Sequence, residues 1–222
     1  MYSFAVTASS IKKKIITLIL LALNVGTFIV VNVYLGQLYL LQLAQNNLLI
    51  SLGEYYRLFT SMFVHADIYH LLSNMVFLVI FGLLVENKYS VIQYLSIYIF
   101  SGLIGNIVSY FVLPREIFSL GASGCIFGVL GAYYVSFTEY DRSMILYAIV
   151  SSLVMVGLSI GTTVNSWAHL FGAIGGLFLG WIFTLYKRKK KNKTKTDYYD
   201  GNQFSYTDME NIEDDDEEIE DY

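Results

Sequence analysis

Charged residues are scarce in this sequence of 222 residues. They make up 14% of the chain, against roughly a quarter in a typical soluble domain, and none occurs between residues 143 and 186. The single cysteine, Cys125, cannot form an intramolecular disulfide. The single proline, Pro114, leaves the remaining apolar stretches free of this helix-breaking residue. These shortages exclude a disulfide framework and a charge-rich soluble domain.

The parts of the sequence that lack charged residues are long apolar stretches. Hydrophobic residues form 55% of the chain, and a membrane-spanning helix takes about 20 mainly apolar residues. We therefore predict an all-α, multi-pass membrane protein. The stretches are divided at Pro114 and at 161–165, which has the composition of a turn. They predict six spans, at 15–35, 68–85, 91–113, 121–137, 144–160 and 166–186.

The distribution of Lys and Arg predicts the orientation of these spans. With the N-terminus inside, the outer loops hold only Arg57 and Arg115, so the other 12 of the 14 Lys and Arg residues lie inside. Cytoplasmic loops carry the excess of positive charge. We expect a cell-membrane protein with both termini cytoplasmic: an N-terminus at 1–14, a six-helix membrane domain at 15–186 and a tail at 187–222.

Two segments outside the spans have compositions of their own. The long first outer loop, 36–67, contains the apolar stretch 38–50, which predicts a helix lying on the outer membrane surface. The tail begins with a basic block and ends in a run of Asp and Glu at 213–221. Such blocks predict a disordered tail whose basic part lies on anionic lipid. The first apolar run lacks a convincing cleavage site, so no cleavable signal peptide is expected.

The three histidines, His65, His70 and His169, are the first candidates for chemistry. An ionisable residue at membrane depth costs roughly 2.5 kcal/mol or more on insertion scales and marks a functional site by default. His70, Ser123 and His169 each lie about three or four residues into a span that enters the membrane from outside. A helix rises 1.5 Å per residue. We therefore expect these three residues at similar depth.

Ser123 and His169 form a candidate nucleophile and base. A serine hydroxyl is a weak nucleophile until a neighbouring group accepts its proton. Glycines at 124, 128 and 131 in one span and at 172, 176 and 180 in another allow close backbone approach, although such glycines alone usually only pack helices. No Asp or Glu is expected at this depth, so the sequence predicts a Ser–His dyad rather than a triad.

His70 and Asn74 are four residues apart and so share one helical face. Donors on this face, with the backbone N–H of Ser123, would stabilise the oxyanion of an acyl-transfer intermediate. Taken singly, the histidine is explained by packing in the bundle and the asparagine by an interhelical hydrogen bond. Cys125 points about 200° away from Ser123 around the helix and is interpreted as small packing volume. No metal and no cofactor are predicted.

These residues resemble the motifs of a known family, the rhomboid intramembrane serine proteases. The resemblance covers about residues 15 to 186 and rests on three motifs: Gly121-x-Ser123-Gly124, Ala168-His169-x-x-Gly172-x-x-x-Gly176, and His65-x-x-x-x-His70-x-x-x-Asn74. It implies a six-helix rhomboid-like bundle with a long first outer loop. It also implies the nucleophile Ser123, the general base His169, and an oxyanion site at His70 and Asn74.

The resemblance extends to supporting residues. Phe127 stands where relatives often have tyrosine beside the catalytic histidine, so stacking is kept and the hydroxyl is lost. The pair Tyr56-Arg57 resembles a Trp-Arg pair of the first outer loop. Glu86 also recurs at the end of the second span, without an assigned role. The other matched supporting positions are His65, Gly121, Gly124 and Gly172.

The activity implied by the resemblance is that of an endopeptidase that cuts single-pass transmembrane proteins in or near their membrane-spanning segment. Its surroundings are the lipid bilayer, no nucleic acid is expected as a partner, and the oligomeric state stays open. A catalytically inactive rhomboid-like protein that binds membrane proteins is the alternative, but it would lack Ser123 or His169, and both are present. A transporter would need broken helices or charged residues at the membrane midplane, which the sequence does not show.

Overall fold

The computed structural model describes residues 15–136, 143, 146–147, 150 and 165–200, with the main chain alone for 191–200. This part of the chain is helical apart from one short pair of strands. In chain order its elements are α2 (Ile15–Phe28), the π-helical η1 (Ile29–Leu35), α3 (Gln37–Leu43), β1 (Gln45–Asn46), α4 (Asn47–Ser51), α5 (Arg57–Thr60), the 3-10 turn η2 (Ser61–Phe63), α6 (Ile68–Glu86), α7 (Val91–Val112), β2 (Phe118–Ser119), α8 (Ser123–Ser136) and α10 (Ser166–Asp200).

Four helical segments in the described residues are long and apolar enough to cross a membrane, and they match four of the predicted spans. The shorter apolar helix α8 corresponds to the span expected at 121–137. The span expected at 144–160 lies outside the described residues, so the count of six stays a prediction. The chain is a multi-pass membrane protein, with the four long segments at Ile15–Leu35, Ile68–Glu86, Val91–Val112 and Ser166–Lys190.

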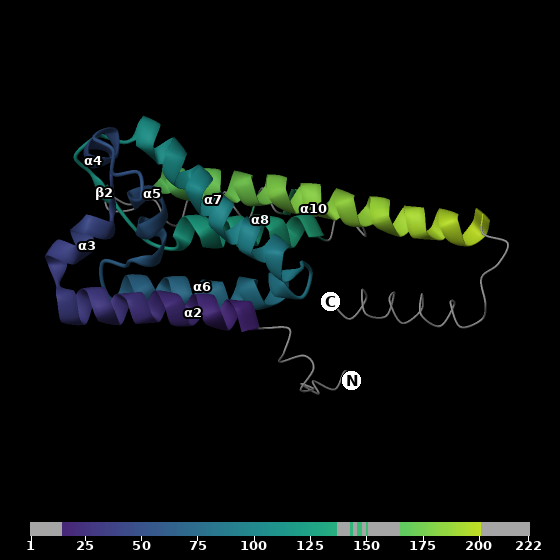
Figure 1. Ribbon diagram of the computed structural model, residues 1–222, viewed down its shortest axis with the longest axis horizontal. Coiled ribbons are helices and arrows are strands. Elements are labelled where there is room, and N and C mark those ends of the chain that lie inside the picture. The colour runs from purple at the N-terminus through teal and green to yellow at the C-terminus, as the bar shows by residue number, and fades with distance from the viewer. Residues whose placement is uncertain (1–14, 137–142, 144–145, 148–149, 151–164, 201–222) are drawn as a thin grey trace.

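The helices pack in two groups that share α8. Figure 1 shows α2 beside α6, and α8 beside α10, and both of these pairs are in contact. The third helix, α7, packs against α8 and α10. Its Tyr94, Ile97 and Tyr98 are fully buried in the core together with Leu78 of α6 and Val129 of α8. The core therefore lies between α2, α6, α7 and α8.

The apolar stretch 38–50 is not the single surface helix that its hydropathy predicts. After α3, the backbone is extended, and β1 pairs antiparallel with β2. The next helix, α4, begins at once, because the Asn46 side chain accepts a hydrogen bond from Leu49 N at 3.1 Å and so caps it. Hydropathy could not reveal a strand partner about 70 residues further along the chain. The prediction of one continuous interfacial helix is therefore wrong.

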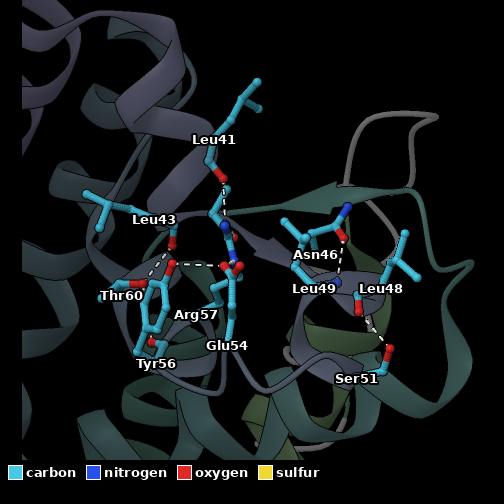
Figure 2. A network of polar contacts seen from close by, with 11 residues as sticks. Leu41, Leu43, Asn46, Leu48, Leu49, Ser51, Glu54, Tyr56, Arg57 and Thr60 are labelled. Atoms are coloured by element: carbon cyan, nitrogen blue, oxygen red, sulfur yellow. Dashed lines mark hydrogen bonds and ion pairs between the residues drawn. The ribbon is translucent and has the colours of Figure 1, made fainter.

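The connecting segment 36–67 is held together by Arg57. This side chain is buried, and its Nη1 donates to the carbonyl oxygens of Leu41 at 2.6 Å and Ala44 at 2.8 Å, while its Nε contacts Glu54 at 2.6 Å (Figure 2). The last carbonyls of a helix lack intrahelical partners. Arg57 supplies partners to the carbonyl oxygens at the end of α3 and ties α3 to α5 within this segment.

The last helix is longer than expected. It continues through the basic block to Asp200 and projects beyond the other helices at the end opposite α3, α4 and α5 (Figure 1). Lysine and arginine are good helix formers, and neither Gly nor Pro occurs at 187–200. The disordered tail predicted to begin at 187 is therefore wrong for 187–200, and residues 201–222 lie outside the described part of the chain.

Candidate active site

Ser123 and His169 lie in contact. Ser123 is the first residue of α8, His169 is the fourth residue of α10, and the Ser123 Oγ lies 2.7 Å from the His169 Nε2. Phe127, one turn after Ser123, stacks on the histidine ring with the ring centroids 4.6 Å apart and the planes 20° apart. Phe127 and His169 are buried, and Ser123 is half-buried. The Ser123–His169 pair is placed for transfer of the serine proton to the imidazole.

Backbone contact between α8 and α10 makes this distance possible. A Cβ added at Gly172 would overlap the carbonyl oxygen of Gly124, and one at Gly176 would overlap the carbonyl oxygen of Gly128. The main chains therefore touch, as in other membrane helices that meet through small residues. The packing role predicted for these glycines agrees with this geometry. Cys125, on the same helix, is fully buried, in agreement with its interpretation as packing volume.

Gly121 lets the chain turn into α8. Its φ is +122°, a value that other residues rarely adopt. Its N–H donates to the carbonyl oxygen of Ser61 at 2.9 Å. A Cβ at this position would lie 2.8 Å from the His70 Nε2, so a side chain here would strike the imidazole. The turn therefore brings the His70 ring close to the segment that carries Ser123.

His70 and Asn74 both lie in the first two turns of α6. The helix is capped by the side chain of Asp67, which accepts a hydrogen bond from His70 N at 2.8 Å. The Asn74 Nδ2 donates to the backbone oxygen of His70 at 2.9 Å. An amide nitrogen has two N–H groups, so the second one can serve another acceptor. Both residues line the cavity that contains Ser123 and His169.

His65 contacts the turn that precedes Ser123. It is fully buried, and its Nε2 lies 3.5 Å from the backbone N–H of Ala122, a long hydrogen bond. Its ring meets the ring of His70 edge-on, with centroids 5.2 Å apart. Burial lowers the pKa of His65 to about 3, and the nearby His70 adds to this effect. The ring is therefore neutral at neutral pH and can accept a hydrogen bond.

A cavity of about 950 Å³ joins these side chains. This volume is in the range of ligand sites. Its described lining is apolar along Phe77, Phe81 and Leu130 and polar at Ser119 and Asn165. Within the described residues, no three His, Cys, Asp or Glu side chains converge on a metal position. The arrangement has the elements of acyl-transfer chemistry: a nucleophile, a base and nearby hydrogen-bond donors.

The sequence did not reveal the roles of two polar residues. Glu86 is buried at the end of α6, where it accepts hydrogen bonds from the backbone nitrogens of Ile16 at 2.7 Å and Thr17 at 3.0 Å, and from Thr17 Oγ1 at 2.6 Å. It thus satisfies the first N–H groups of α2. Asn165, assigned to a turn, lines the cavity and caps α10 through Ala168 N at 2.9 Å. A polar residue at a turn, followed by an apolar run, was a usable capping signal.

Comparison with known proteins gives one family. Residues 52–186, more than half of the chain, match the model of the Rhomboid domain. The "Putative rhomboid protease YdcA" of Bacillus subtilis (strain 168) is 33% identical over 150 residues, which are 65% of this chain and 75% of that protein. The "Rhomboid protease GluP" of the same organism is 37% identical over 143 residues, 61% of this chain and 27% of that protein.

A plant protein is also similar to this chain. The "RHOMBOID-like protein 7" of Arabidopsis thaliana is 36% identical over 141 residues, which are 60% of this chain and 44% of that protein. The chain thus spans less than half the length of this relative and of GluP. The match to the Rhomboid domain at 52–186 includes the segments that carry Ser123 and His169.

Proposed function

The chain belongs to the rhomboid family, and from this premise we propose that it is an intramembrane serine endopeptidase. The observation that carries the proposal is the 2.7 Å contact between Ser123 Oγ and His169 Nε2 at the wall of a cavity of about 950 Å³. Two relatives, one named a rhomboid protease and the other a putative rhomboid protease, support the same activity. The alternative is a catalytically inactive family member that binds membrane proteins. Binding alone does not require a contact between a serine hydroxyl and a histidine ring.

The nucleophile in this proposal is Ser123. His169 accepts the hydroxyl proton while Ser123 Oγ attacks the carbonyl carbon of a peptide bond, and it then gives the proton to the leaving amine. A water molecule, activated by the same imidazole, releases the acyl group and restores the serine. Phe127, stacked on the ring at 4.6 Å, holds the plane of the imidazole while the proton moves. No carboxylate is needed to orient the base, so the pair acts as a dyad.

The developing oxyanion is stabilised from two sides. Ser123 begins α8, where backbone N–H groups have no intrahelical acceptor and the positive end of the helix dipole lies. His70 and Asn74 line the same cavity from α6. One removed oxyanion donor typically costs roughly 100- to 1000-fold in turnover in soluble serine proteases. These side chains are therefore assigned to transition-state stabilisation, and His65, Gly121, Gly124 and Gly172 to positioning.

The membrane setting determines the substrate class. The cavity is lined by residues of the apolar helices α6, α8 and α10, and we infer that the substrates are single-pass transmembrane proteins cut in or near the membrane-spanning segment. The proposed topology has six spans and a long first outer loop at 36–67, with both termini in the cytoplasm and the protein in the cell membrane. The excess of Lys and Arg on one side supports this orientation.

Co-expression with a tagged single-pass membrane protein tests the proposal. The wild-type chain is expected to give a shorter tagged fragment, whereas Ser123→Ala and His169→Ala give none although each is inserted at the wild-type level, because nucleophile and base act as a unit. Ser136→Ala is the matched control. It removes a hydroxyl at the other end of α8 that, among the described residues, donates to the Tyr133 carbonyl oxygen at 2.6 Å.

Two results would contradict the proposal. A fragment produced equally by Ser123→Ala would place the hydrolysis elsewhere. Stable binding of the tagged protein by the wild-type chain, with no fragment from a panel of such substrates, would favour the inactive membrane-protein-binding alternative.

A further inference from the structure

The side chain of Asn165 joins three segments of the site. Its Oδ1 accepts a hydrogen bond from Ala168 N at 2.9 Å and so caps α10. Its Nδ2 lies 2.9 Å from Ser109 Oγ on α7 and 2.8 Å from Ser119 Oγ on β2. One amide therefore connects the start of the helix that carries the base to a neighbouring helix and to the strand before the nucleophile.

Both N–H groups and the carbonyl oxygen of this amide have hydrogen-bond partners. An asparagine amide offers two N–H donors and one carbonyl acceptor. Ser109 Oγ also lies 3.1 Å from Asn165 Oδ1, but it has one proton and lies 2.8 Å from the carbonyl oxygen of Gly105. The consistent assignment has Ser109 donating to Gly105 and accepting from Asn165. The two amide protons then serve Ser109 and Ser119, and Oδ1 serves the helix cap.

The contact between Asn165 and Ser119 lies the same number of residues before the proposed dyad on both segments. Ser119 precedes Ser123 by four residues, and Asn165 precedes His169 by four residues. The Asn165–Ser119 distance is 2.8 Å and the Ser123–His169 distance is 2.7 Å. Two side-chain hydrogen bonds thus link the same pair of segments, one turn of α10 apart.

On each segment, a backbone hydrogen bond holds the chain between the residue of the Asn165–Ser119 contact and the residue of the dyad. On the α10 side, the backbone N–H of His169 donates to the carbonyl oxygen of Asn165 at 3.3 Å, in the first turn of the helix. On the other side, the N–H of Gly121 is held by the Ser61 carbonyl oxygen at 2.9 Å between Ser119 and Ser123. A shift at the Asn165–Ser119 contact is therefore transmitted to the distance between nucleophile and base.

We propose that Asn165 is a positioning residue for the dyad: through Ser119 it fixes the distance between Ser123 Oγ and His169 Nε2. This inference rests on the proposed proteolytic function. Asn165 takes no part in bond making, and it acts on the rate only by holding the two reacting side chains in place. An error of about 1 Å in such a placement can cost on the order of 100-fold in rate.

Two substitutions separate positioning from helix capping. Asn165→Ser keeps a good capping residue but is too short to reach Ser109 and Ser119. Ser119→Ala removes one end of the link and leaves the cap of α10 intact. Ser136→Ala serves as the control for the loss of a serine hydroxyl. Combining Asn165→Ser with Ser119→Ala completes a double-mutant cycle.

The measurement is the second-order rate constant for labelling of detergent-solubilised full-length protein by a fluorophosphonate, normalised to the folded fraction. The Ser123 oxygen forms a bond to phosphorus, fluoride leaves, and His169 takes the serine proton. This small probe needs the dyad but no transmembrane substrate. We expect Asn165→Ser and Ser119→Ala each to lower the rate constant about 10-fold or more, and the double variant to be no slower than the slower single variant. Ser136→Ala should match the wild type.

The outcomes are distinguishable. Wild-type labelling in folded Asn165→Ser, or single-variant effects that multiply in the double variant, would overturn the link while leaving the proteolytic function intact. A lowered melting temperature with an unchanged rate constant would show that Asn165 is structural only. If Asn165→Ser does not fold, Ser119→Ala alone decides. Labelling absent from the wild type, or equal in Ser123→Ala, would overturn both the link and the proposed function.

Discussion

Replacing Gly172 with alanine adds one methyl group where α8 and α10 touch main chain to main chain. Besides overlapping the Gly124 carbonyl oxygen, the new Cβ would lie 2.9 Å from the Gly124 carbonyl carbon and 3.1 Å from its Cα. Ordinary carbon contacts lie at about 3.5–4.0 Å, so the helices must separate by roughly 0.5–1 Å. Ser123 lies next to Gly124, and His169 lies one turn before Gly172. The 2.7 Å distance between their side chains then lengthens to roughly 3.2–3.7 Å, at or beyond the limit of a hydrogen bond.

The expected loss of turnover for Gly172→Ala is about 10- to 100-fold. It is measured as cleavage of a transmembrane substrate in detergent, beside a thermal melt. Gly175→Ala is the matched control, because it adds the same methyl group on the same helix, but its nearest neighbour is the flexible end of the Ile104 side chain at 3.0 Å. This control should retain most of the activity. Near-wild-type turnover in Gly172→Ala would show that the glycine contact does not set the catalytic distance, even if the dyad itself is right.

Three other predictions concern the surroundings of the dyad. Asn74→Ala should lower kcat about 100- to 1000-fold and leave residual cleavage, with an unchanged melting temperature; complete loss of both folding and activity would indicate a structural role instead. Glu86→Ala should lower the free energy of unfolding by about 2 kcal/mol, because the N–H groups at the start of α2 lose their buried acceptor, and a denaturation midpoint equal to that of the wild type would contradict this. The buried, neutral His65 binds its proton only near pH 3, whereas an unfolded histidine binds it near pH 6.5. Its contribution to stability is therefore present above pH 6.5 and falls as the pH drops from 6.5 to about 3, by about 1.4 kcal/mol per pKa unit. The difference in stability between the wild type and His65→Gln should be constant above pH 6.5 and should shift against the wild type as the pH falls from 6.5 to about 3. Stability curves that stay parallel over this range would refute the assignment.

The candidate site was largely predictable because rare residues mark it. A chain with three histidines and long charge-free stretches leaves few choices for a base, and the depth of Ser123 and His169 along their spans brought them to the same level before any contact was known. The glycines at 124 and 172 added a reason for close approach. Residue types and helical spacing are enough to predict such contacts, because the sequence shows the side chains of both partners.

The contacts that could not be predicted are those between a side chain and a distant backbone. Glu86 accepts from N–H groups about 70 residues earlier, and nothing in the residue types at 16 and 17 reveals that partnership. The polar residues Gln45 and Asn46 break the expected surface helix because the strand at 118–119 pairs with them. Hydropathy averages over such positions. It also carries no information on where α10 ends, because a lysine-rich helix and a lysine-rich coil have the same composition.

Because α8 and α10 meet main chain to main chain, the residues of the proposed chemistry lie in two parts of the molecule that differ in stiffness. The stiff part consists of α7, α8 and α10, and the more compliant part is α6. Main-chain atoms have no rotamers to exchange, and α7, α8 and α10 pack more extensively on one another than α6 packs on any of them. The nucleophile and base belong to the stiff part, and His70 and Asn74 to α6. A bilayer of different thickness acts by changing helix tilt, so it reaches the compliant part first. Lipid composition would then tune how well the oxyanion is held, while the nucleophile stays equally reactive.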